Sequence, residues 1–350
     1  MTKNKWDLFK SILKGEESNL HLGLIVDSPW MPGYCGISNI DFYVRPDAWY
    51  DSYIKIKKDF PDILYLPDWW AEYAMATEPS GFGVNFHFYD DNLPGVSPLI
   101  DDMDDAEDII ARLKTPNPKK DGLMPLLLNL QRYMLPKLAE IGEQINIVST
   151  RGPLTIASHL FSVTELLMCA KADPDVVHKL LKMTSQLCKD WLSAQLENVG
   201  HAEGVLMLDD ITGFFSEEDY MEFAHPYMKD IFSAFPECIH LFHNDTPNDV
   251  SFPHMEDMGV NLFNFTHEKD LGAVRAAVGS NVTLLGNVPP MALARNTPDE
   301  VFEMTKSCID SYISEAGSTK GLMLSVGGGV PMGAKGECIQ AMLDAASEHK

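Results

Sequence analysis

The sequence predicts a (β/α)8 barrel, and three observations lead to this fold class. Eight short apolar runs recur along the chain, and each is too short for a helix but suits a buried parallel strand. Amphipathic segments of helical length lie between several of these runs. The chain of 350 residues has the length of one large α/β barrel or of two ordinary domains. We therefore expect a single barrel domain over residues 1–350.

The alternative architecture is a doubly wound parallel sheet. A dinucleotide-binding sheet of that kind carries a Gly-x-Gly-x-x-Gly motif after its first strand, and no such motif follows the first apolar run here. The eight expected strands, in chain order, are residues 22–26, 63–66, 145–149, 205–208, 239–242, 262–265, 282–285 and 322–325.

Four of the segments between these strands are expected to be helices, and the N-terminal segment MTKNKWDLFKSILKGEE is also expected to be an amphipathic helix. The four segments are residues 47–58, 174–199, 216–234 and 298–314. Thr297-Pro298 is typical of a helix start. Ser216 can cap the third of these helices, with Asp219 in the capping-box position.

One connection is much longer than a crossover helix requires. Roughly 80 residues separate the second expected strand from the third. This segment contains an aromatic stretch of alternating character, an acidic run and a proline-rich link. We expect residues 69–145 to form an inserted region that caps the barrel mouth, the alternative being an excursion without a role in the site.

Composition and charge exclude several classes of protein. The net charge is −24, from 27 basic and 51 acidic side chains, which disfavours nucleic acids and anionic membrane surfaces as partners. The six cysteines form no Cys-x-x-Cys pair, and the N-terminal segment does not resemble a signal peptide. No run approaches 18 apolar residues. We expect a cytoplasmic protein with reduced thiols, and a homo-oligomer is compatible with the sequence.

In a barrel of this kind the active site lies at the carboxyl ends of the strands. The candidate residues there are polar side chains that bind metals or transfer protons. They are Asp27, Asp68, Arg151, Asp209, Asp210, His240, His243, His267 and Asn287.

His240 and His243 are the strongest candidates for metal ligands, because histidine is the commonest metal ligand in proteins. Residues i and i+3 of a strand lie on opposite faces, so the two histidines can share a metal only if the strand ends before His243. The alternative is one core histidine and one loop histidine. Asp209 is a candidate general acid, metal ligand or ligand-orienting group, and a helix cap is the alternative for this pair of aspartates.

Two further features are candidates for substrate binding. Trp30 and Trp69 follow expected strands and could line a flat apolar pocket, together with Asp27 and Asn287. Gly327, Gly328 and Gly329 follow the last strand and allow a ligand to approach the backbone closely, a tight turn being the alternative.

Four stretches of the chain resemble the uroporphyrinogen decarboxylase superfamily, which includes cobalamin-dependent methyltransferases. The matching stretches occur in family order, and the resemblance covers roughly residues 20–347. They are LMLDDITGFFSEEDYMEFAHPYMKDIF, CIHLFHND, FNFTHEKDLGAVRAAVGSNVTLLGNVPP and LMLSVGGGVPMGAKGECIQAMLDAA. The family fold is a (β/α)8 barrel, which agrees with the strand count.

Departures from the family pattern help to choose a branch. Porphyrin decarboxylases resemble one another in an arginine-rich N-terminal segment, whereas the equivalent stretch here, DSPWMPGYCG, has no arginine. They also carry a histidine where this chain has Gly328. The thiol-methylating branch uses a zinc site of His-x-Cys and a later cysteine, and these positions are His240, Phe242 and Gly328 here.

The N-terminal half is most similar to the methyltransferase I components of anaerobic O-demethylase systems. The similar stretches are GYCGISNIDFYVRPDAWYDSYIKIKKDFPD, LPDWWAEYAMATEPSGFG and LKTPNPKKDGLMP. This resemblance implies methyl transfer from a methoxylated aromatic compound to Co(I) of cobalamin on a separate corrinoid protein. No Asp-x-His-x-x-Gly corrinoid motif is present in this chain.

Cleavage of an ether requires a Lewis acid or a proton donor at the oxygen, and we expect Asp209, His240 and His243 to have catalytic roles. Our hypothesis is a Zn²⁺ ion held by His240, with His243, His267 or Asp209 completing the site, and the metal or a protonated Asp or His beside it would bind the ether oxygen. Three alternatives stay open at this point: a decarboxylase of another carboxylated ring, a methylcobalamin:thiol methyltransferase, and a binding protein without catalysis.

Overall fold

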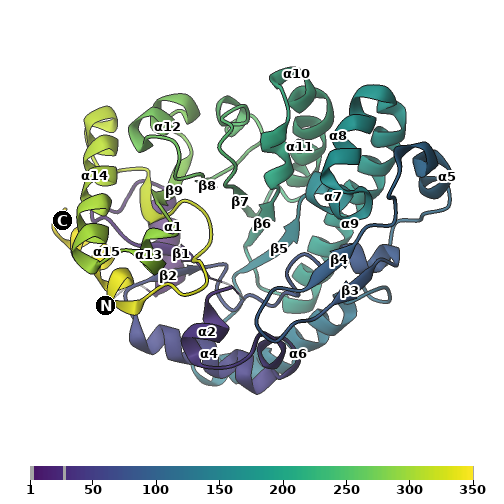
Figure 1. The fold of residues 1–350 in the computed structure, drawn as a ribbon. Coiled ribbons are helices and arrows are strands. Elements are labelled where there is room, and N and C mark those ends of the chain that lie inside the picture. Colours follow the sequence, from purple (N-terminus) through teal and green to yellow (C-terminus); the bar gives the residue numbers. More distant parts are fainter. Residues whose placement is uncertain (1–3, 27–28, 350) are drawn as a thin grey trace. The chain divides into compact units, whose positions relative to one another are not determined.

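The computed structural model describes residues 4–26 and 29–349, and these residues form two compact units. The first unit comprises the chain up to Asp68 together with the segment from Ile239 onwards, and the second comprises Trp69–Cys238. Figure 1 shows the elements of both units. The second unit begins at the first residue of the expected insertion. The prediction that residues 69–145 form an inserted cap is not tested by this division.

Parallel strands form the centre of the first unit. Strands β7 (Ile239–Asn244), β8 (Leu262–Phe265), β9 (Thr283–Val288) and β10 (Leu322–Val326) lie side by side in this order, each parallel to the next. Strand β1 (Gly23–Ile25) pairs in parallel with β2 (Leu64–Leu66). A parallel bridge from Leu22 to Leu324 joins β1 to β10. Buried apolar side chains fill these strands, as expected when helices cover a parallel sheet.

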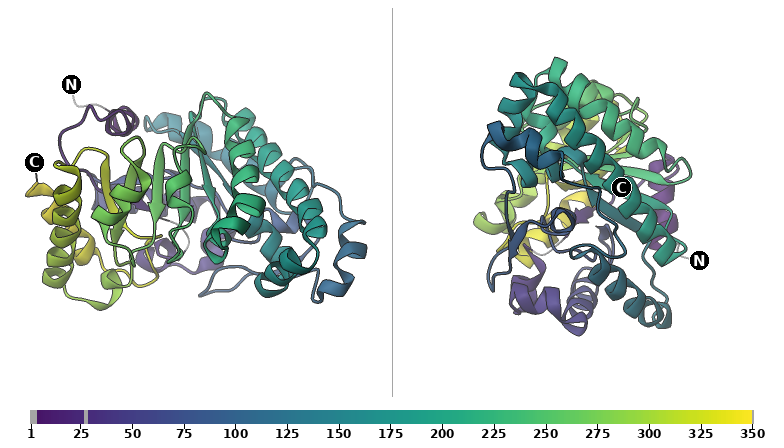
Figure 2. Two further views of the ribbon diagram at one scale, coloured as in Figure 1. Left: turned by 90° about the horizontal axis from the view of Figure 1, so that it is seen from above. Right: turned by 90° about the vertical axis from the view of Figure 1, so that its right-hand side faces the viewer.

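Helices alternate with these strands along the chain. The first segment contains α1 (Lys5–Leu13), α2 (Met31–Cys35), α3 (Asn39–Val44) and α4 (Pro46–Asp59). The second segment contains η5 (Phe252–His254), α12 (Leu271–Val278), α13 (Ala292–Arg295), α14 (Pro298–Ala316) and α15 (Gly336–Ser347). Helix α14 packs against both α12 and α15, and the left view of Figure 2 shows α14 and α15 side by side.

The second unit contains two parallel strands and a separate hairpin. Strands β5 (Ile147–Arg151) and β6 (Gly204–Leu208) pair in parallel. Strand β3 (Asn85–His87), within the aromatic stretch, forms an antiparallel hairpin with β4 (Gly95–Ser97), which follows that stretch. The segment from Trp69 to the start of β5 also contains η1 (Pro79–Phe82), η2 (Met103–Asp105), α5 (Ala106–Ile110) and α6 (Met124–Glu140).

The remaining helices of the second unit follow β5 and β6. Helices α7 (Pro153–Phe161), α8 (Val163–Ala172) and α9 (Pro174–Val199) connect the two strands. After β6 come η3 (Asp210–Phe214), α10 (Glu217–Asp219), the π-helical turn η4 (Tyr220–Ala224) and α11 (His225–Ser233). Among the described residues, no single helix is long and apolar enough to cross a membrane. Helices α7 and α8, which are bent relative to one another, reach the required length and apolar composition only when taken together.

All eight expected strands are present, and so are the expected helices. Ser216 accepts a hydrogen bond from the backbone N–H of Asp219, as the cap prediction requires. Thr297 and Glu300 form a reciprocal capping box at the start of α14. The structure confirms the α/β class with parallel strands. Closure of the eight strands into one barrel stays a prediction, because the strands are divided between the two units.

Candidate functional site

His243 is held in one orientation at the carboxyl end of β7. Its ring Nδ1 lies 2.7 Å from Oδ1 of Asn264, the residue beside it on β8. Its Nε2 lies 4.0 Å from Oδ2 of Asp245, which directly follows the strand. The His243 side chain is 8% exposed and that of Asp245 is 42% exposed. This arrangement places a histidine and a carboxylate together where the sequence predicts the active site.

His240 lies on the other face of β7, near its first residue. Strand β7 continues to Asn244, so the condition for a metal shared by His240 and His243 is not met. The ring Nδ1 of His240 bonds the carbonyl oxygen of Gly259 at 2.9 Å, in the loop that enters β8. Its neighbour Phe242 stacks on Phe263, 5.8 Å between ring centroids. These contacts assign His240 to the packing at the amino end of the strands.

Two other predicted residues of the first unit differ in exposure, since Asn287 is buried and His267 is exposed. Asn287 is buried on β9, and its side-chain NH2 donates to the carbonyls of Thr266 and Lys269 at 3.1 and 2.7 Å. Asn287 therefore ties β9 to the loop after β8. His267 is exposed in that loop, and its backbone packs against Gly327. Asp27 lies outside the described residues.

Both predicted tryptophans belong to the core. Trp30 is 1% exposed and donates its indole N–H to the carbonyl of Ala334 at 3.1 Å. Trp69 is fully buried and donates to the Glu143 carboxylate at 3.0 Å. A substrate could reach these rings only after their neighbours had moved. The structure therefore gives no support to the prediction that they line an apolar pocket.

Asp209 follows β6 in the second unit and is completely buried. Its Oδ2 accepts a hydrogen bond from the backbone N–H of Leu154 at 2.9 Å, and its Oδ1 accepts one from the Thr155 hydroxyl at 3.0 Å. Burial raises the pKa of Asp209 to about 7, although these hydrogen bonds oppose the shift. The carboxyl group therefore connects the end of β6 to the first turn of α7 and makes no cap hydrogen bond with η3, the helical turn that follows it.

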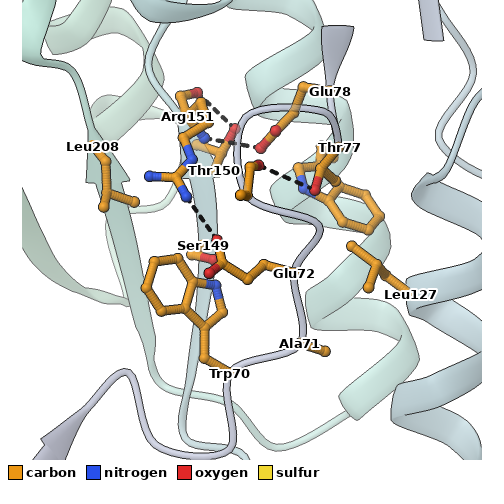
Figure 3. A pocket seen from close by; sticks show the side chains of 12 residues that line it. Trp70, Ala71, Glu72, Thr77, Glu78, Leu127, Ser149, Thr150, Arg151 and Leu208 are labelled. Atoms are coloured by element: carbon orange, nitrogen blue, oxygen red, sulfur yellow. Dashed lines mark hydrogen bonds and ion pairs between the residues drawn. The ribbon is translucent and has the colours of Figure 1, made fainter. Parts of the chain in front are cut away.

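A buried charged cluster lies at the carboxyl end of β5, within the second unit. A guanidinium nitrogen of Arg151 lies 2.6 Å from Oε2 of Glu72, and the backbone N–H of Arg151 donates to Oε1 of Glu78 at 2.8 Å. The Arg151 guanidinium also lies 5.5 Å from the ring centroid of Trp70. Figure 3 shows Arg151 between the two glutamates. The cluster borders a cavity with about 10 Å³ of room for the centre of a water molecule, which suffices for one water.

Burial shifts the pKa values of the groups around this cluster. It raises the pKa of Glu78, and the charge of Arg151 opposes that shift. Burial, with the charge of Arg151 as a second cause, lowers the pKa of His159 to about 4. Burial also raises the pKa of the Cys188 thiol, which donates to the carbonyl of Arg151. His159 is therefore neutral at physiological pH, and Cys188 is protonated.

Four residues of these two clusters were not predicted from the sequence. Asn264 interrupts the apolar strand Leu-Phe-Asn-Phe, and a polar residue inside a buried strand is a signal that could have revealed it. Asp245 directly follows a predicted strand-end histidine. Glu72 and Glu78 lie in an irregular segment without periodicity, so the sequence offers no comparable signal for them.

Comparisons with known proteins identify the family. The sequence profile of the family described as "Uroporphyrinogen decarboxylase (URO-D)" matches residues 70–349. The uroporphyrinogen decarboxylase of Aromatoleum aromaticum is 23% identical over 292 residues, which cover 79% of this chain and 76% of that protein. The uroporphyrinogen decarboxylase of Idiomarina loihiensis is 27% identical over 292 residues, covering 77% and 71%.

A solved structure with a similar fold is a methyltransferase from Methanosarcina mazei. Its TM-score is 0.79, and the match covers 97% of this chain and 96% of that one, at 16% identity. At this level of identity the similarity concerns the fold alone. It agrees with the alternation of parallel strands and helices in both units.

Proposed function

Because the chain belongs to the uroporphyrinogen decarboxylase family, we propose that it is a corrinoid-dependent methyltransferase of the O-demethylase type. It transfers a methyl group from a methoxylated aromatic compound to Co(I) of a corrinoid that a separate protein carries. The Methanosarcina mazei methyltransferase has a similar fold, so the fold of this chain is compatible with methyl transfer. The resemblance of the N-terminal half supports the aromatic ether as the methyl donor.

The observation that carries this proposal is the pairing of positive charges at the strand ends. Arg151 is a buried arginine at the carboxyl end of β5. Its guanidinium is paired with Glu72, and its backbone N–H donates to Glu78. Lys269, after β8, pairs with Asp249 at 2.9 Å. A porphyrin with several carboxylates needs several cations that can form new ion pairs. A neutral or weakly charged aromatic ether has no such requirement.

The reaction that we propose defines what the residues must do. The bond between the methyl carbon and the ether oxygen breaks, its electron pair stays on the oxygen, and the methyl carbon bonds to cobalt. Co(I) becomes methyl-Co(III), and the phenolate that leaves takes up a proton. Developing charge on that oxygen requires an acid or a cation nearby. His243, at the carboxyl end of β7, is the candidate of the first unit for this role.

The residues fit a zinc ion only with a ligand set different from that of the thiol-methylating branch. Phe242 and Gly328 cannot coordinate a metal, and His240 packs on the far face of β7. A histidine nitrogen and a carboxylate oxygen remain at the end of β7, and such ligands are harder than thiolates. A Zn²⁺ ion at these ligands would act as a Lewis acid toward the ether oxygen.

A methyl-transfer assay tests the proposal. The purified protein is mixed with a panel of methoxylated aromatic compounds and several corrinoid proteins reduced to Co(I). We expect the Co(I) absorbance to fall and methyl-Co(III) to appear with at least one ether. Omission of the ether, and heat-inactivated protein, are the controls. Stable Co(I) with every ether and every corrinoid partner would overturn the proposal.

Decarboxylation of a carboxylated ring is the second candidate function. The names of the curated relatives, which are uroporphyrinogen decarboxylases at 23–27% identity, favour it. The paired cations and the sequence DSPWMPGYCG, which lacks arginine, oppose it. Release of CO2 from a carboxylated ring without any corrinoid protein would identify this activity.

A further inference from the structure

Arg275 is a buried arginine in the last turn of α12, and the protein uses only part of its guanidinium group. The residue is 6% exposed. Its Nη1 donates to the carbonyl oxygen of Val282 at 2.9 Å, and it makes longer hydrogen bonds to the Tyr312 hydroxyl at 3.4 Å and the Gly321 carbonyl at 3.5 Å. No described residue accepts a hydrogen bond from Nε or Nη2, and both atoms are buried.

The hydrogen bonds of Arg275 leave its positive charge without an opposite charge. Carbonyl and hydroxyl oxygens are neutral acceptors, and the ion pairs in the described part of the chain do not include Arg275. Arginine is rarely buried unless it is paired, because removal of a charge from water is unfavourable. The bonds of Nη1 explain how Arg275 ties α12 to the turns that precede β9 and β10. They do not explain the buried Nε and Nη2.

The two nitrogen atoms without an acceptor form one edge of the guanidinium group. The N–H groups of Nε and Nη2 point in parallel, and this edge is a fork that binds two oxygens of one anion. Phosphate and carboxylate groups present two oxygens with the matching geometry. The edge of Arg275 that the protein leaves without an acceptor is therefore suited to bidentate binding of an oxyanion.

Arg275 lines a cavity of about 570 Å³ in the first unit. Lys14 and Lys320 also line this cavity, and Glu315 is the acidic residue of its lining. Three cationic side chains and one carboxylate therefore surround the cavity, although the chain as a whole has a net charge of −24. The local charge favours an anion. The volume is typical of small-molecule sites and exceeds what a single phosphate ion fills, so the anionic group belongs to a larger molecule.

We propose that this cavity binds a small molecule through a phosphate group, with Nε and Nη2 of Arg275 as the bidentate donors. Phosphate is favoured over a carboxylate because it carries more negative charge, and Lys14 and Lys320 add two cations to the arginine.

The phosphate site is distinct from the candidate site for methyl transfer. Arg275 bonds the carbonyl groups of Val282 and Gly321, which directly precede β9 and β10, so it lies at the amino ends of these strands. His243 lies toward the carboxyl end of β7. The inference therefore goes beyond the proposed function and does not depend on it.

Binding requires part of the cavity wall to shift, because Nε and Nη2 are buried. Lys14, Ser280 and Lys320 are exposed residues of the lining, and they lie outside the helices and strands. Segments of this kind rearrange at a lower cost in free energy than strands or helices do. A bound phosphate group would then provide the opposite charge for the buried guanidinium.

The test is a calorimetric titration of the full-length protein with inorganic phosphate at low ionic strength. We expect one phosphate ion per chain, weaker binding of acetate and no binding of chloride. The temperature of thermal unfolding should rise with phosphate concentration, because a ligand that binds only the folded protein stabilises it. Sodium chloride at the same ionic strength is the control for a general effect of salt.

A pair of arginine variants tests the assignment of the donor. Arg275→Lys should weaken phosphate binding by about 10- to 100-fold, because lysine keeps the charge but lacks the bidentate edge. Arg295→Lys is the matched control, since Arg295 is an exposed arginine of the same unit that does not line the cavity. This variant should bind phosphate as the wild-type protein does. Equal losses of affinity in the two variants would overturn the inference.

Two variants of exposed side chains keep the test valid if Arg275→Lys does not fold. Glu315→Gln removes the carboxylate of the cavity and should strengthen phosphate binding by about 2- to 5-fold. Lys320→Gln removes a cation and should weaken binding by about 2- to 5-fold. Unchanged affinity in both variants would overturn the inference. Acetate binding that is tighter than phosphate binding would overturn the assignment of a phosphate group.

Discussion

Arg151 and Glu72 form a buried ion pair with an N–O distance of 2.6 Å, and their side chains are 8% and 7% exposed. Removal of one partner would leave the other charge buried without its ion pair. For Arg151, the remaining carboxylate would be that of Glu78, which accepts a hydrogen bond from the Arg151 backbone N–H. We expect Glu72→Gln to lower the free energy of unfolding by about 3 kcal/mol. Urea denaturation followed by circular dichroism measures the change.

The exposed pair Lys119–Glu197 provides the control for this substitution. Its N–O distance is 2.7 Å, but its side chains are 56% and 70% exposed. Glu197→Gln should therefore change the free energy of unfolding by no more than about 1 kcal/mol. Equal effects of the two substitutions would show that burial of the Arg151 pair does not matter for stability.

Asp209 should make stability depend on pH. Burial raises its pKa to about 7, whereas the unfolded chain releases this proton near pH 4. Between these values the folded protein holds the proton more tightly, so the contribution of Asp209 to stability falls as pH rises toward 7. Compared with Asp209→Asn, the wild-type protein should lose about 2 kcal/mol between pH 5.5 and 7.5.

The pH prediction is checked by urea denaturation of both proteins at several pH values in that range. The difference in the free energy of unfolding between the two proteins isolates Asp209, because the other carboxylates are present in both. A difference that does not change with pH would show that the carboxyl group is ionised in the folded protein throughout.

The sequence was sufficient to predict the strands, but not the orientation of the site residues. A short apolar run flanked by polar residues defines a buried strand locally, and all eight were found. The face that His243 occupies depends on where β7 ends, and a difference of two residues reverses the relation between His240 and His243. The strand continues because Asn244 pairs with Phe265, a contact that the local sequence does not encode.

The buried glutamates show a different limit of sequence analysis. Glu72 and Glu78 are close to Arg151 only because the irregular segment after β2 folds back onto β5, more than 70 residues later in the chain. Periodicity describes neighbours along a helix or strand, and it contains no information on such a long-range contact. Charged residues in loops are usually exposed, so composition predicts the opposite of what is found.

Gly152 should tolerate no side chain, because it lies against Asp209. A Cβ atom at position 152 would overlap the Asp209 carboxylate, which is buried and bonded to Leu154 and Thr155. We expect Gly152→Ala to lower the free energy of unfolding by about 1–3 kcal/mol. Gly33→Ala is the control, since Gly33 is helical and a Cβ atom added there would have no other atom within 4 Å. That change should be neutral or stabilise by up to about 1 kcal/mol.

The charges at the strand ends predict weak binding of a polycarboxylated porphyrin. The Arg151 guanidinium is paired with Glu72, Lys269 is paired with Asp249, and the partly exposed carboxylate of Asp245 follows β7. A ligand with several carboxylates would meet negative charge without enough cations to offset it. We expect uroporphyrin to bind at least 100-fold more weakly than it binds the uroporphyrinogen decarboxylase of Aromatoleum aromaticum. Equilibrium dialysis of both proteins at the same ionic strength measures this ratio, and comparable affinities would favour the decarboxylase candidate over methyl transfer.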